Sequence, residues 1–113
     1  MTRQALLALV IAGVLSAAVW ALSPALTGHA EPWDSNGPFY VAALAIAGAL
    51  AGGLVPKPLW ALYLGAVAGQ VAYQLLFLRL GPLFPLGLLF LLGYAIVFLA
   101  AAALAAFIRL RWQ

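Results

Sequence analysis

Residues 83–108 read LFPLGLLFLLGYAIVFLAAAALAAFI and carry no charged side chain. A helix of about 20 apolar residues is long enough to cross the roughly 30 Å of hydrocarbon in a bilayer. The segment is apolar throughout and lacks the alternation that marks a membrane β-strand, so we expect a helix. The sequence therefore indicates a fold built of helices in lipid.

The rest of the chain repeats this pattern, with uncharged stretches at 4–28, 35–56 and 58–78. Pro56-Lys57-Pro58 ends one helix and starts the next, because proline cannot extend a helix but fits its first turn. We expect an all-α membrane protein, a single domain of four transmembrane helices packed as two antiparallel hairpins. The expected helices cover residues 4–22, 39–55, 59–78 and 83–108, with an outer loop over 23–38.

The composition excludes several classes of protein. Of the 113 residues, 68% are hydrophobic and 6% are charged, and the mean hydropathy is +1.17. Soluble domains are about 45–50% apolar and about 25% charged, and disordered chains are less hydrophobic still. The five basic residues lie at chain ends and turns, so they predict no nucleic-acid partner. The absence of cysteine excludes disulfides and thiolate metal sites.

Lys and Arg predict the orientation, because cytoplasmic loops are enriched in both. If the N-terminus is cytoplasmic, only Arg79 is external, and four basic residues are internal: Arg3, Lys57, Arg109 and Arg111. We therefore expect both termini in the cytoplasm and the protein in a bacterial cytoplasmic (inner) membrane. The tryptophans are expected to be interfacial anchors at helix ends, at Trp20, Trp33, Trp60 and Trp112.

The first helix has a competing interpretation as a cleaved signal peptide. Such a segment has three features that this chain also shows: a basic residue at Arg3, an apolar run, and small residues around His29. The apolar run over 5–22 exceeds the usual 7–15 residues of a signal core. A retained helix is therefore the expectation, and cleavage stays open as the alternative.

Small residues predict where helices approach closely, because lipid gives apolar helices no other strong reason to associate. The second and third helices each have a glycine four residues after another, at Gly48 and Gly52 and at Gly65 and Gly69. We expect these two helices to pack tightly against each other. The Gly-Pro pairs at 37–38 and 81–82 also fit a duplicated hairpin, although such pairs are common at helix starts.

No predicted span contains an acid, a base or a histidine. Proton-coupled transporters generally need such a group inside the membrane. In length and helix number the chain resembles the small multidrug resistance transporters, but the carboxylate of their first helix has no counterpart between Gln4 and Leu22. A single histidine gives no sign of a catalytic triad, so we expect no enzyme activity.

Polar side chains nevertheless occur inside the third and fourth spans, at Gln70, Tyr73, Gln74 and Tyr94. An unpaired amide in hydrocarbon costs several kcal/mol, so these side chains are expected to face protein or water. We interpret them as an interhelical polar cluster, with a hydrogen bond between Gln70 and Tyr94. The alternative is a polar path for a solute.

The outer loop holds the only histidine and both acids, and we interpret it as a partner-contact loop through His29, Glu31, Trp33 and Asp34. The spacing matches no metal motif, so no metal is expected. Ligation of haem or a pigment by His29 is the less favoured alternative, and no cofactor is expected.

These observations predict a non-catalytic small subunit of a larger membrane complex, with electron-transfer and photosynthetic complexes as candidates. Its partners would be the lipid bilayer and other membrane subunits or copies of itself. The alternative is a homo-oligomeric channel or transporter for a neutral or weakly charged solute. A membrane-permeabilising, holin-like protein is a third, weaker hypothesis.

Overall fold

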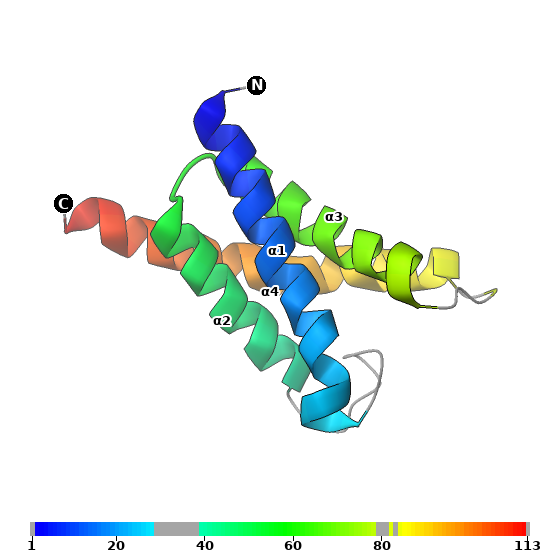
Figure 1. Cartoon of the computed structure of the whole chain (residues 1–113). Helices are drawn as coiled ribbons and strands as arrows, with labels where there is room; N and C mark the ends of the chain where they lie inside the picture. Colours follow the sequence, from blue (N-terminus) through cyan, green and yellow to red (C-terminus); the bar gives the residue numbers. More distant parts are fainter. Residues whose placement is uncertain (1, 29–38, 79–81, 83, 113) are drawn as a thin grey trace.

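The computed structural model describes residues 2–28, 39–78, 82 and 84–112. It contains four helices (Figure 1): α1 (Arg3–Thr27), α2 (Phe39–Leu54), α3 (Leu59–Phe77) and α4 (Phe84–Arg111). The all-α, four-helix expectation is confirmed. The helices α1, α3 and α4 are each long and apolar enough to cross a bilayer, which indicates an integral membrane protein. The α2 helix is apolar but has only 16 residues, about 24 Å at 1.5 Å per residue.

The first helix is longer than expected, because it continues through Pro24 and ends at Thr27 instead of near residue 22. The connection to α2 therefore starts at Gly28. Membrane helices tolerate proline when neighbouring groups satisfy the freed backbone atoms. Gly28 ends the helix with a φ of 80°, a left-handed conformation that glycine adopts without steric cost, and its N–H donates to the Pro24 carbonyl at 3.1 Å.

The closest helix packing is between α1 and α3 and between α2 and α4. In each pair the two helices run in the same direction, since Gly65 lies against Leu9 and Gly69 against Gly13. Gly52 likewise lies against Ala102, one turn after the contact of Gly48 with Phe98. Consecutive helices still reverse direction, but Figure 1 shows them splayed, so that each hairpin crosses the other.

The expectation that α2 and α3 pack tightly together is wrong, because these two helices barely touch. Their glycines do support close packing, but against α4 and α1. A Cβ atom at Gly65 would lie 2.6 Å from the carbonyl oxygen of Leu9, and one at Gly48 would overlap the backbone of Phe98. Backbones this close gain dispersion contacts that larger side chains would prevent.

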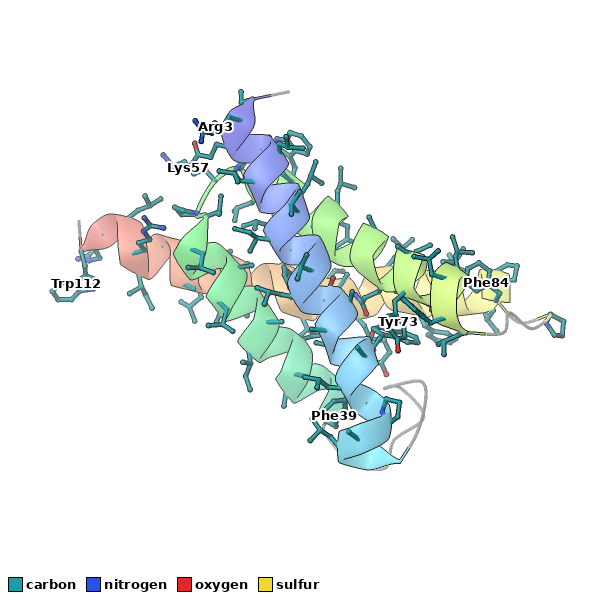
Figure 2. All side chains as sticks on the ribbon, viewed as in Figure 1. Arg3, Phe39, Lys57, Tyr73, Phe84 and Trp112 are labelled. Carbon is teal, nitrogen blue, oxygen red and sulfur yellow. The ribbon has the colours of Figure 1, made fainter. Side chains whose placement is uncertain are left out.

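Both termini and the α2–α3 turn lie at the same end of the bundle (Figure 2), where Arg3, Lys57 and Trp112 are labelled. At this end the side chain of Arg109 reaches across to α2. Its Nη1 donates to the carbonyl oxygens of Gly53 and Leu54, at 2.7 Å each. A cation here satisfies carbonyl groups that the last turn of a helix leaves unpaired and interacts favourably with the helix dipole.

Replacing Arg109 with methionine should therefore loosen the end of α2. We expect backbone amides near Val55, which donates to the Ala51 carbonyl, to exchange hydrogen about two- to five-fold faster. Hydrogen-exchange mass spectrometry would measure this change. Arg111→Met is the matched control, because Arg111 is exposed and makes no hydrogen bond to the described residues. Equally faster hydrogen exchange in both variants would show that the Arg109 hydrogen bonds do not hold the end of α2.

Candidate functional site

A buried polar cluster centred on Gln70 joins three helices. The Gln70 side chain is fully buried, and its Oε1 accepts hydrogen bonds from Trp20 Nε1 at 2.8 Å and from the Tyr40 hydroxyl at 2.5 Å. Its Nε2 donates to the carbonyl of Ala66 on its own helix at 3.0 Å. One amide on α3 thus binds side chains from α1 and α2.

The fourth helix joins the cluster through ring packing. The Tyr40 and Tyr94 ring centroids are 4.7 Å apart with the rings tilted by 52°, and the Trp20 and Tyr40 rings meet edge to face at 6.3 Å. Both arrangements fall in the range favoured by aromatic quadrupoles. The aromatic rings shield the Gln70 hydrogen bonds from lipid, so the cluster is a closed contact among all four helices.

The structure separates the side chains that the sequence grouped. Gln70 and Tyr94 both belong to the cluster, but the partners of Gln70 are Trp20 and Tyr40 instead of the expected Tyr94. Gln74 is buried, and within the described part of the chain its amide donates only to the backbone carbonyl of Gln70, at a long 3.5 Å. Tyr73 stacks on Phe77 of the same helix, with ring centroids 4.9 Å apart.

Trp20 and Tyr40 belong to the cluster, although their positions in the sequence did not indicate it. The prediction that Trp20 is an interfacial anchor is wrong, because its side chain has no exposed surface and lies among the helices. Their chemistry could have identified them. A buried tryptophan N–H or tyrosine O–H needs an acceptor, and the Gln70 amide offers one. The outer-loop candidates His29, Glu31, Trp33 and Asp34 lie outside the described residues, so their roles stay predictions.

The sequence matches no protein-family model, and no curated protein or solved structure is significantly similar to it.

The buried polar groups satisfy one another. Within residues 2–28, 39–78 and 84–112, every buried side-chain nitrogen and oxygen has a hydrogen-bond partner. Such a network holds helices together, and individual bonds in membrane proteins contribute about 0.6 kcal/mol on average and about 1.7 at most. The cluster is therefore a structural joint, in which hydrogen bonds hold the helices together.

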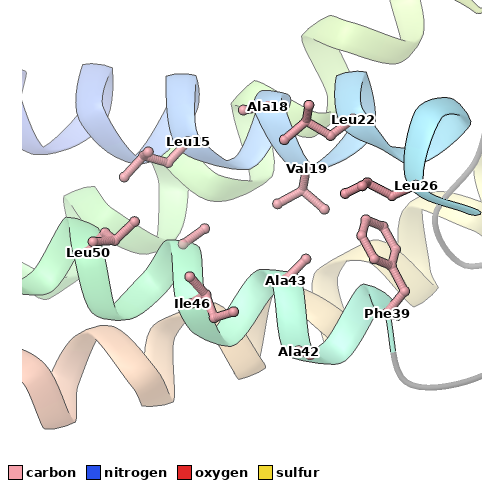
Figure 3. Close-up of a pocket in the computed structure, with 11 residues that line it drawn as sticks. Leu15, Ala18, Val19, Leu22, Leu26, Phe39, Ala42, Ala43, Ile46 and Leu50 are labelled. Atoms are coloured by element: carbon pink, nitrogen blue, oxygen red, sulfur yellow. The ribbon is translucent and has the colours of Figure 1, made fainter.

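A lateral groove lies beside this joint, between α1 and α2 (Figure 3). It has a volume of about 340 Å³. Leu15, Val19 and Leu22 line it from α1, opposite Ala43 and Ile46 on α2. A second apolar hollow of about 420 Å³ lies between α3 and α4, where Tyr63 donates to the carbonyl of Leu92. The splay of each hairpin leaves these grooves open along the sides of the bundle.

Proposed function

We propose that this chain is a non-catalytic small subunit of a larger complex in the bacterial cytoplasmic membrane, which it crosses four times with both termini in the cytoplasm. The α1–α2 groove is the observation that carries the proposal. Its lining is apolar, and it opens on the side of the bundle. A transmembrane helix of another subunit is the occupant that fits such a groove.

The length of α2 favours protein over lipid on this side. At about 24 Å, α2 is shorter than the roughly 30 Å of hydrocarbon. A short apolar helix thins the surrounding bilayer unless it packs against other protein. Covering α2 with a partner helix relieves this mismatch.

The positions of the basic residues support the proposed orientation. Arg109 and Arg111 lie in the last turn of α4, at the end of the bundle that also carries Arg3 and Lys57. This asymmetry agrees with the enrichment of Lys and Arg in cytoplasmic segments.

The alternative of a homo-oligomeric channel or transporter would place Gln70 and Gln74 at an axis between copies. Both amides are buried among the four helices of one chain, with 0% and 4% of their surface exposed. They therefore give no support to a polar path between copies, and we do not propose one.

To test the proposal, a bulky side chain is placed in the groove and the loss of bound partner subunits is measured. Ala42 lines the groove and is exposed, so Ala42→Phe fills the groove without crowding the core. Tagged chain is expressed at native level in its own host, extracted in mild detergent and resolved by native electrophoresis with mass spectrometry. We expect wild type to migrate with stoichiometric partners and Ala42→Phe to retain less than one fifth of them.

Ala68→Phe is the matched control, because Ala68 is an exposed alanine on α3 that does not line this groove. It should keep the partners. Wild-type chain that migrates alone, or equal retention by both variants, would contradict the proposal.

A further inference from the structure

We infer that the end of the bundle carrying the termini binds the headgroup of an anionic phospholipid. The site is a hollow of about 470 Å³ between α1, α2 and α4. Its wall combines polar and apolar side chains from the start of α1, the end of α2, the following turn and the end of α4. They include Gln4, Leu7, Leu54, Lys57, Arg109 and Leu110.

Among the residues that the structure describes, no acidic side chain balances the positive charge at this end. The whole sequence has only two acids, Glu31 and Asp34, and both belong to the stretch that connects the end of α1 to the start of α2. The hollow lies at the opposite end of both helices. Lys57 and Arg109 line the hollow, and Arg3 and Arg111 belong to the ends of α1 and α4 on the same side of the bundle, with no carboxylate among the described residues there. An anion from outside the chain is therefore favoured.

The side chains of the hollow still have donors to offer. Lys57 is exposed, and its ammonium group makes no hydrogen bond to any described residue. Arg109 uses Nη1 for the two carbonyls of α2, which leaves the donors on Nη2 and Nε of its guanidinium. The exposed Gln4 amide adds a neutral donor. Phosphate oxygens suit this set, because ammonium and guanidinium groups both bind them strongly.

The apolar part of the wall favours a lipid over free phosphate. Leu7, Leu54 and Leu110 line the hollow and keep 46%, 61% and 39% of their surface exposed. These side chains point to a ligand that is charged at one end and apolar at the other. Basic pockets between transmembrane helices on the cytoplasmic side bind anionic headgroups for the same reason.

Native mass spectrometry of the full chain in mild detergent tests the site, with dioleoyl phosphatidylglycerol as the probe and dioleoyl phosphatidylcholine as the neutral comparison. We expect the anionic lipid to bind at least five-fold more tightly. Lys57→Gln should weaken it about five-fold, the effect expected for one cation near a charged headgroup. Arg111→Gln removes the same charge from the same end outside the hollow and should weaken binding less than two-fold.

Four results would each overturn the assignment. Equal weakening by Lys57→Gln and Arg111→Gln would show diffuse attraction instead of a site. Equal affinity for the neutral lipid would remove the role of the cations. Displacement of phosphatidylglycerol by millimolar inorganic phosphate, or equally tight binding of its dihexanoyl form, would show that the apolar wall contributes nothing.

Discussion

Replacing Gln70 with leucine should lower the free energy of unfolding by about 2–4 kcal/mol. The substitution keeps the approximate size of the side chain but removes the oxygen that accepts from Trp20 and Tyr40. Both donors are buried, at 0% and 3% exposure, so neither can turn to water. Removing one partner of a buried hydrogen bond costs about 1–3 kcal/mol, more than the bond itself contributes.

Unfolding in mixed micelles with increasing denaturing detergent, followed by circular dichroism, would measure this loss. Gln74→Leu is the control, because Gln74 is the same residue type one turn further along α3 and is also buried. Among the residues described, its amide donates only to a backbone carbonyl of its own helix, at 3.5 Å. We expect a change below about 0.5 kcal/mol. Equal losses in the two variants would show that the cluster does not join the helices.

Adding one methyl group at Gly52 should lower the free energy of unfolding by a similar amount, because the added atom would clash with α4. A Cβ atom there would lie 2.7 Å from the Cα of Ala102 and would overlap the adjoining carbonyl oxygen. Backbone cannot rotate away as a flexible side chain can, so α2 and α4 must separate along their whole contact. We expect Gly52→Ala to lower the free energy of unfolding by about 2–3 kcal/mol.

The neighbouring glycine gives a control with the opposite sign. A Cβ atom at Gly53 meets nothing within 4 Å. Because glycine disfavours the helix relative to alanine, Gly53→Ala should raise the free energy of unfolding by about 0.5–1 kcal/mol. The same unfolding assay compares the two. A stabilised or unchanged Gly52→Ala would refute the close contact between α2 and α4.

The existence of the helices could be predicted because span length and charge placement are local properties of the chain. The predicted start of the second helix, residue 39, agrees with the structure. The end of the first helix could not be read this way, since Pro24 is a helix breaker in water but is retained within α1.

Helix pairing could not be predicted, because a stripe of small residues shows that a helix packs closely without showing its partner. Gly48 and Gly65 belong to similar stripes, yet one meets Phe98 on α4 and the other meets Leu9 on α1. Matching these surfaces depends on shape complementarity among four helices. Spacing along one helix carries no such information.

The buried cluster was partly predictable. The cost of an amide in hydrocarbon marks Gln70 as a residue that needs a partner, whatever the fold. Its partners depend on tertiary structure, because Trp20 and Tyr40 lie 50 and 30 positions away in sequence.

Because α1 pairs with α3, the two surfaces of their interface are synthesised at different times. Gly13 is separated from Gly69, its neighbour across the interface, by 56 positions. At about 5–20 residues per second, a ribosome needs about 3–11 seconds to synthesise that interval. During this time the small-residue face of α1 is in the membrane without its partner. Until α3 follows, that face lacks the close backbone contacts that it makes with Gly65 and Gly69 in the folded protein.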